Sequence, residues 1–140
     1  MAGERLVVDT NIVVSGLLTS DSRSPTRLLL DLMLAGKRRF ILSTDLLTEY
    51  RMVLLRPKIA AAHRLSAKEI DEILVRLAAN AVIVEPPAAG AGMPRDLGAD
   101  EHILALLESA KDSILVTGDL ALLRRAGSRA RRPSEVFTAL

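Results

Sequence analysis

The sequence contains no cysteine, and this absence excludes several kinds of site. A chain without cysteine forms no disulfide bond and offers no thiolate to zinc or to an iron–sulfur cluster. Tryptophan is also absent, and the only aromatic residues are Phe40, Tyr50 and Phe137. Nucleic-acid modules that stack bases need aromatic platforms, so the composition argues against that class. The core is expected to be aliphatic.

Long hydrophobic runs are missing as well. The longest apolar run is far shorter than a membrane span. The N-terminus reads Met1-Ala2-Gly3-Glu4, and its acidic residue and short apolar run are unlike a signal peptide. With 140 residues, 49% of them hydrophobic, the chain can bury one core. We therefore expect a soluble, cytoplasmic protein with a single domain spanning residues 1–140.

The basic residues are mostly arginine, although the net charge is only +2. Arginine presents a planar fork that matches phosphate oxygens, whereas a GC-rich genome would favour arginine codons without any such function. Five arginines gather near the C-terminus, a pattern that fits either a solvated surface or a contact to a nucleic-acid backbone. These are Arg124, Arg125, Arg129, Arg131 and Arg132.

Short apolar runs alternate with segments of helical periodicity along the whole chain. The expected strands cover residues 6–8, 40–42, 81–84 and 113–116, with a small fifth strand at 129–132. The expected helices begin after Ser24-Pro25, cover 43–55, follow a capping box at Ser66–Glu69, cover 100–110 and 119–125, and begin again at Pro133. Pro57 is expected to end the helix before it. This alternation predicts a three-layer α/β/α sandwich around a central parallel sheet of four to five strands.

Four acidic residues occupy positions typical of a ligand-binding or catalytic site. Asp9 and Asp119 follow strands, and the carboxyl ends of parallel strands are where open α/β sheets bind ligands. Asp100 falls on the apolar stripe of its expected helix, which contains Ile103, Leu104, Leu107 and Ala110. Glu49 lies at the flank of the buried face of the helix over 43–55.

Each acid also has a simpler interpretation. Asp9, Asp100 and Asp119 precede helices, where aspartate is a preferred cap, and Glu49 fits the rim of an amphipathic helix. If the four converge, each like-charged pair near 4 Å costs about 4 kcal/mol at an effective dielectric of 20. Protonation or a bound cation relieves this repulsion, so the carboxylate pKa values are expected to be raised. Oxygen ligands favour Mg²⁺ or Mn²⁺ over zinc.

The other reactive residues give no comparable pattern. His102 is expected on the far side of its helix from the apolar stripe, hence at the surface, and His63 in a loop. Neither Ser15 nor Ser43 has a base positioned by the sequence, which leaves a hydrolase triad unsupported. The turn after the first strand is acidic where a phosphate-binding loop would carry glycine.

In four segments the sequence resembles the PIN-domain family, specifically its VapC-like branch of bacterial toxins. They are Val7-Val8-Asp9-Thr10-Asn11 with the apolar residues to Leu18, Leu42-Ser43 through Leu47-Thr48-Glu49, Arg95-Asp96 through Asp100-Glu101-His102-Ile103-Leu104-Ala105, and Val116-Thr117-Gly118-Asp119 through Leu123. The resemblance covers about residues 5–137. Two departures occur: Ala121 stands where relatives often carry aspartate, and Leu97-Gly98 replaces a usual Pro-Asp.

The resemblance implies a metal-dependent ribonuclease, the toxin of a toxin–antitoxin module. It assigns the conserved acids to Asp9, Glu49, Asp100 and Asp119. It also gives Thr117 the hydroxyl position beside the last acid, and Asn11 the place of a residue that orients the first. Asp9, Asp100 and Asp119 are expected to bind Mg²⁺ or Mn²⁺, with Glu49 holding water or a second ion.

The expected partners are RNA, a small antitoxin and further copies of the chain in a homodimer or higher oligomer. Two other functions fit parts of the same pattern. The first is a PIN fold kept as an RNA-binding or scaffold module without catalysis. The second is a receiver-type signalling domain, but the third expected strand ends Val84-Glu85-Pro86 without the required aspartate, and no lysine follows Lys111.

Overall fold

The computed structural model describes residues 4–87 and 99–138, and its strands all run parallel. Two groups of strands, β1-β4-β5 and β2-β3, are joined by a parallel bridge between Leu6 and Phe40. The spatial order is therefore β3-β2-β1-β4-β5. The strands are β1 (Arg5–Val8), β2 (Ile41–Leu42), β3 (Val82–Ile83), β4 (Ser113–Val116) and β5 (Ala130–Arg131).

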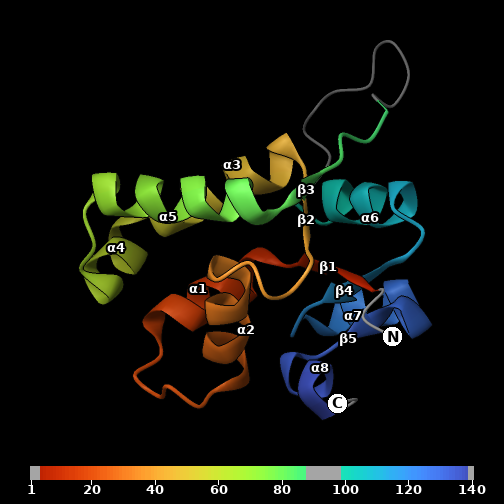
Figure 1. The fold of residues 1–140 in the computed structure, drawn as a ribbon, viewed down its shortest axis with the longest axis horizontal. Helices are drawn as coiled ribbons and strands as arrows, with labels where there is room; N and C mark the ends of the chain where they lie inside the picture. The colour runs from red at the N-terminus through yellow and green to blue at the C-terminus, as the bar shows by residue number, and fades with distance from the viewer. Residues whose placement is uncertain (1–3, 88–98, 139–140) are drawn as a thin grey trace.

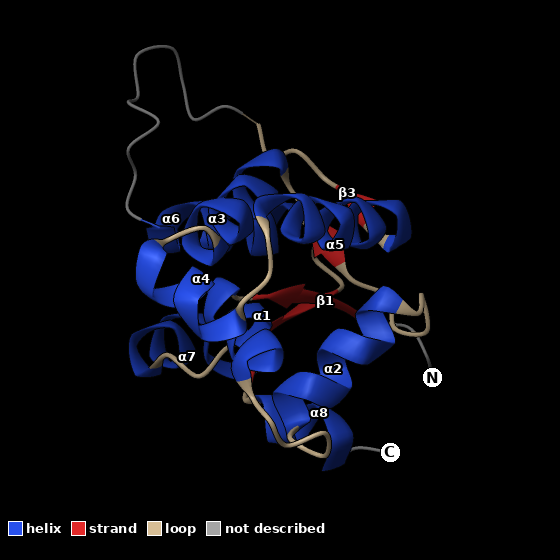
Figure 2. Cartoon of the chain, turned by 90° about the vertical axis from the view of Figure 1, so that its left-hand side faces the viewer, coloured by secondary structure: helices blue, strands red, loops and turns tan. Residues whose placement is uncertain are grey.

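Helices cover both faces of these strands, which gives the expected three-layer architecture. The helices are α1 (Thr10–Leu18), α2 (Pro25–Leu34), α3 (Thr44–Leu54), α4 (Pro57–His63), α5 (Ala67–Asn80), α6 (Ala99–Ser109), α7 (Leu120–Ala126), the 3-10 helix η1 (Gly127–Arg129) and α8 (Pro133–Thr138). On one side of the strands lie α3, α5 and α6, and on the other lie α1, α2 and α8 (Figure 1, Figure 2). No helix in the described ranges is long and apolar enough to cross a membrane.

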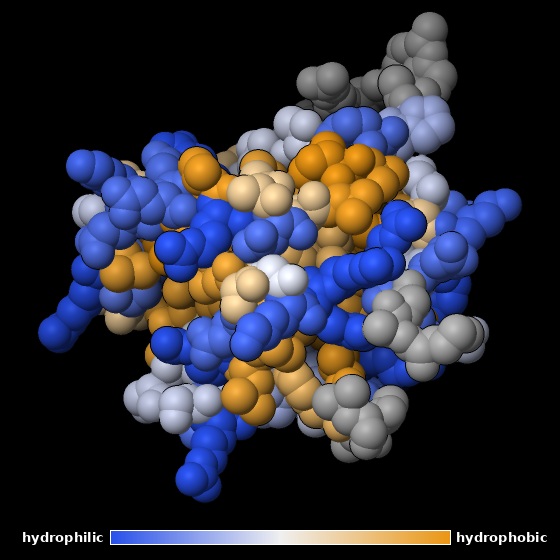
Figure 3. All heavy atoms as spheres, in the orientation of Figure 1, coloured by the Kyte–Doolittle hydropathy of each residue, from blue (hydrophilic) through white to orange (hydrophobic). Residues whose placement is uncertain are grey.

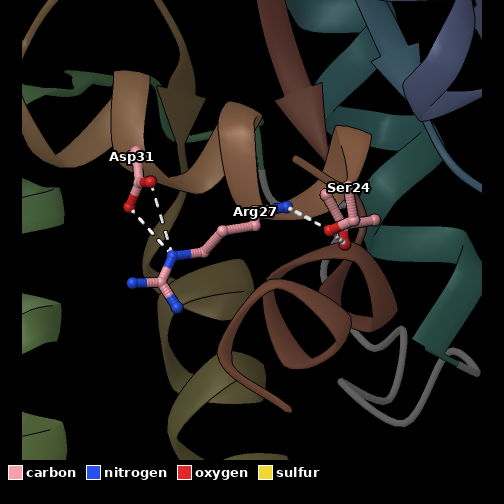
Figure 4. Close-up of polar contacts among 4 residues, drawn as sticks. Ser24, Arg27 and Asp31 are labelled. Atoms are coloured by element: carbon pink, nitrogen blue, oxygen red, sulfur yellow. Dashed lines mark hydrogen bonds and ion pairs between the residues drawn. The ribbon is translucent and has the colours of Figure 1, made fainter. Parts of the chain in front are cut away.

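Side-chain caps mark the starts of several helices. Figure 4 shows the start of α2, where the Ser24 hydroxyl accepts a hydrogen bond from the Arg27 backbone at 3.2 Å. One turn on, Arg27 pairs with Asp31 at 3.2 Å, an i,i+4 ion pair on the exposed face. The capping box predicted at Ser66 and Glu69 is confirmed at the start of α5.

The region around Pro57 confirms one prediction and corrects another. The helix before Pro57 ends at Leu54, as predicted, and Pro57 itself is the first residue of a further helix, α4. Proline suits that position because the backbone N–H that it lacks would have no partner there. His63 is accordingly not in a loop: it ends α4, where its ring bonds to the Leu54 carbonyl at 2.8 Å and accepts from the Leu65 backbone at 2.9 Å.

The core is mostly aliphatic, as the composition predicted, but Phe40 and Tyr50 are both fully buried within it. Gly16 lets α1 approach α2 closely, since a Cβ atom there would lie 2.8 Å from the Thr26 carbonyl oxygen. Some large apolar side chains remain exposed, and Figure 3 shows such patches among charged groups on one face. Within the described residues, the exposed large apolar side chains are Leu18, Leu28, Met52, Val75, Val82, Ile83 and Leu120.

Candidate active site

Asp9 lies where the strand order changes direction. The chain proceeds from β1 toward β2 and β3 on one side and later toward β4 and β5 on the other. Such a switch point opens a crevice at the carboxyl ends of the two central strands, and ligands of open α/β sheets bind there. Asp9 directly follows β1, and its backbone N–H bonds to the carbonyl of Val116, the last residue of β4, at 2.9 Å. The residue as a whole is only 6% exposed.

Thr117 connects the two strand-end aspartates. Its buried hydroxyl donates to Asp9 Oδ2 at 2.8 Å and accepts from the Asp119 backbone N–H at 3.0 Å. Asp9 precedes α1 without a side-chain capping bond, although its carboxylate also interacts with the backbone N–H of Thr10, the first residue of α1. Its carboxylate is therefore not used as a cap. The side chain instead turns toward β4 and the site.

Glu49 reaches the same region from α3. The hydroxyl of Thr10, the residue after Asp9, donates to Glu49 Oε2. The next residue, Tyr50, is completely buried and donates its hydroxyl to the carbonyl of Val8. Burial, then the charges of Asp9 and Glu49, raise the pKa of Tyr50 well above its usual 10.0, so the phenol stays protonated as that donor. These two bonds fasten α3 to the end of β1 and the start of α1.

His102 also contacts Glu49, which corrects the expectation that it lies at the surface. Its Nε2 atom is 3.0 Å from Glu49 Oε1, and both side chains are 18% exposed. The buried face of α6 contains Leu106 in place of the expected Leu104, since its buried residues are Ile103, Leu106 and Leu107. At about 100° per residue this rotation brings His102 to the flank of the buried face, toward α3. The packing of α3 against α6, which the sequence does not record, decides this contact.

The surroundings of Asp9 and Glu49 shift the pKa values of these two acids in opposite directions. Burial raises the pKa of Asp9; hydrogen bonds from Thr117 and the Thr10 backbone oppose this, and the charges of Glu49 and Asp100 add to it. Burial also acts to raise the pKa of Glu49, but bonds from His102 and Thr10, with the charges of His102 and Arg56, outweigh it and lower the pKa. The expectation that repulsion raises the acids' pKa values is therefore wrong for Glu49.

The remaining predicted site residues fall into different positions. Asp100 is the second residue of α6, partly buried, and near enough for its charge to act on Asp9. Asp119 caps α7: its Oδ1 accepts from the backbones of Ala121 at 2.8 Å and Leu122 at 3.2 Å. Asn11 is exposed at the start of α1, and within the described ranges its side chain bonds to no acid. Its orienting role stays a prediction.

The five C-terminal arginines differ in how their side chains are engaged. The Arg129 guanidinium bonds to the carbonyls of Leu107 at 2.8 Å, Ala110 at 2.9 Å and Ser113 at 3.0 Å, so it fastens the end of α6 to β4. Arg125 pairs with Glu101 at 2.8 Å on the exposed surface. Arg131 bonds to the carbonyls of Ser128 and Ala130, while Arg124 and Arg132 are exposed. Arg129 thus has a structural function, and the contact of the five to nucleic acid stays a prediction.

The acids at the switch point suit a divalent cation by their chemistry. Asp9 is a nearly buried carboxylate on which two further negative charges act, and all the donors are hard oxygen atoms. A cation would lower this repulsion. Among residues 4–87 and 99–138, however, no three acidic or histidine side chains come together closely enough to form a metal-binding group. The oxygen donors fit a divalent cation by their chemistry, although the described side chains do not form a complete coordination group.

The comparison with known families identifies the fold. The model of the PIN domain matches residues 5–121, which include Asp9, Glu49, Asp100 and Asp119. The chain belongs to the PIN family. PIN domains are in general nucleases that use divalent metal ions, and they act on nucleic acids. Membership leaves no place for the receiver-type alternative. No curated protein matches the chain.

Proposed function

We propose that this PIN domain is a metal-dependent endoribonuclease that hydrolyses phosphodiester bonds at the carboxyl ends of β1 and β4. The observation that carries the proposal is the nearly buried carboxylate of Asp9, on which the charges of Glu49 and Asp100 act. A fold retains such a cluster at a cost in stability, and binding a cation offsets that cost. Capping explains the Asp119 contacts, but Asp9 makes no side-chain cap bond and is held by the hydroxyl of Thr117 instead.

The residues of the chain have distinct functions in this mechanism. Asp9 and Asp100 would hold Mg²⁺ or Mn²⁺ directly, and Asp119 would do so directly or through water. When bound, the cation supplies Lewis acidity, neutralises charge on the phosphate and lowers the pKa of water. Thr117 holds Asp9 in place through the bond to Oδ2. Glu49, kept ionised by its lowered pKa, accepts a hydrogen bond from the attacking water and orients it.

A cleavage assay tests the proposal directly. A single-stranded RNA should be cut in the presence of Mg²⁺ or Mn²⁺, not in the presence of a chelator, and not by Asp100→Asn. The alternative, a PIN module that binds RNA without catalysis, predicts retained RNA in a binding assay and no products under any of these conditions. Cutting that continues in chelator would rule out the metal mechanism.

Arginine contacts should make RNA binding sensitive to salt. Replacing Arg124, Arg125, Arg131 and Arg132 with alanine is expected to weaken RNA binding and to flatten its dependence on salt. Counterion release gives a slope of about −0.7 per phosphate contacted on single strands, so the slope should fall by up to about 3. Binding titrations between low and high salt measure this.

Arg129→Ala provides the contrasting variant, because its guanidinium is bonded to the carbonyls at the end of α6. Arg129→Ala should lower the melting temperature and change the salt slope of RNA binding only a little. If the four-alanine protein binds RNA with unchanged affinity and slope, this cluster is only a solvated surface.

The VapC-like resemblance supports a narrower biological role. We propose that the protein acts in the cytoplasm as the toxin of a toxin–antitoxin module, and that it forms a homodimer and binds a small antitoxin. A short reading frame that overlaps the start of this gene would support an antitoxin. Co-expression is the corresponding experiment: the product of that frame should suppress RNA cleavage by the purified complex.

A further inference from the structure

The two histidines of the chain are bonded in different ways. Both ring nitrogens of His63 have partners, the Leu54 carbonyl and the Leu65 backbone N–H. In His102 only Nε2 has a partner, Glu49, while Nδ1 is buried without a hydrogen bond in the described structure. A buried polar atom without a partner lowers stability, and a role in the chemistry of a site is one reason for a fold to keep it.

Glu49 is held at both ends of its carboxylate by donors from different elements. Thr10 from α1 donates to Oε2, and His102 from α6 bonds to Oε1 at 3.0 Å. A carboxylate oxygen only accepts, so Nε2 of His102 carries the proton in this bond. Glutamate loses considerable rotamer freedom when it is fixed, and here that ordering is complete before any substrate arrives.

The same bond also fixes the position of Glu49 on α3 relative to Asp100 on α6. His102 and Asp100 both belong to α6, whereas Glu49 belongs to α3. A fixed contact between His102 and Glu49 therefore sets the separation of Glu49 from Asp100. Arrangements of catalytic groups lose much of their effect when they are misplaced by about 1 Å, so this connection has a functional consequence.

We propose that His102 is a positioning residue, which holds the Glu49 carboxylate in the orientation that the reaction needs. The inference rests on the proposed nuclease function and adds a residue that does not touch RNA itself. Groups that orient acidic or metal-binding residues in this way typically contribute 10- to 100-fold, as a rough range, to activity or metal affinity.

The test compares matched substitutions at the two histidines. His102→Leu keeps a side chain of similar size without the donor, and kcat for RNA cleavage should fall about 10- to 100-fold with KM within about twofold. His102→Gln places an amide nitrogen at a similar reach and should restore most of kcat. His63→Leu, the matched control, should lower the melting temperature but leave kcat unchanged, since His63 lies outside the site. All assays run below the lowest melting temperature of the set.

A double-mutant cycle separates positioning from a general effect on the fold. In a Glu49→Gln background, His102→Leu should reduce kcat little further, because its target is already changed. Calorimetric titration with Mn²⁺ provides a readout besides activity. His102→Leu should bind the ion more weakly, because the lost contact with Glu49 also releases α6, which carries Asp100, from its position against α3. If His102→Leu fails to fold, His102→Asn replaces it, since its shorter amide does not reach the position of Nε2.

Three results overturn the inference. The first is a His102→Leu protein with wild-type kcat and wild-type Mn²⁺ affinity, and the second is an equal loss of kcat with and without Glu49; both leave the proposed nuclease function standing. The third is a wild type that neither cuts RNA nor binds Mn²⁺. That result removes the proposed function, and with it the role of His102.

Discussion

Replacing Asp9 with asparagine is expected to abolish metal-dependent RNA cleavage while the fold survives. Asparagine keeps the size of the side chain and an oxygen that can accept the bond from Thr117, but it removes the negative charge at the centre of the cluster. The loss should reach roughly 10³-fold or more in kcat, or about 4 kcal/mol of transition-state stabilisation. Single-turnover cleavage in Mn²⁺ measures it, and circular dichroism checks the fold.

A matched control lies at the other edge of the sheet. Asp112 is exposed and directly precedes β4, so it lies at the amino end of the strand whose carboxyl end borders the site. Asp112→Asn makes the same chemical change and should leave cleavage unaltered. A cleaving Asp9→Asn protein would show that the chemistry lies elsewhere or needs no charge at this position.

Much of the fold could be predicted because local signals and tertiary packing agree. The strand at Ser113–Val116 occurs at its predicted bounds, since an apolar run between polar neighbours has one way to be buried in a parallel sheet. Pro57 shows the opposite case. Proline ends one helix and suits the start of another, and only the chain that follows decides between them.

The candidate site could be predicted only in part, because a sequence shows which face of a helix is buried better than it shows what that face meets. Asp9 and Asp119 could be placed at strand ends from the runs before them. The contact of His102 with Glu49 joins residues 53 positions apart and depends on how α3 packs against α6. The direction of the Glu49 pKa shift follows from that contact, so it could not be predicted either.

Without metal, Asp9 should destabilise the protein at neutral pH, and divalent ions should reverse this. Burial raises the pKa of Asp9 in the folded state above its ordinary 3.8, so near those pH values the native state holds more protons than the unfolded state. Stability therefore falls as pH rises through the raised pKa, and the full penalty is present above it. Glu49 behaves in the opposite way: its lowered pKa gives stability above 4.5 that is lost as pH falls through the folded value.

The two acids can be separated by the charge-neutral variant Asp9→Asn. In chelator at neutral pH this protein should melt at a higher temperature than the wild type, and the difference should disappear below about pH 3.8, where Asp9 is protonated in both states.

Mn²⁺ at a hundredfold excess over its dissociation constant should stabilise the wild type by about 2.7 kcal/mol, which is roughly 5–10 °C in melting temperature for a chain of this size. Asp9→Asn should gain much less. Thermal unfolding of both proteins across pH, with chelator and with Mn²⁺, gives these values. A wild type indifferent to Mn²⁺, together with an Asp9→Asn protein that is less stable in chelator, would mean that the buried carboxylate serves the fold through its bond with Thr117 and has no cation to hold.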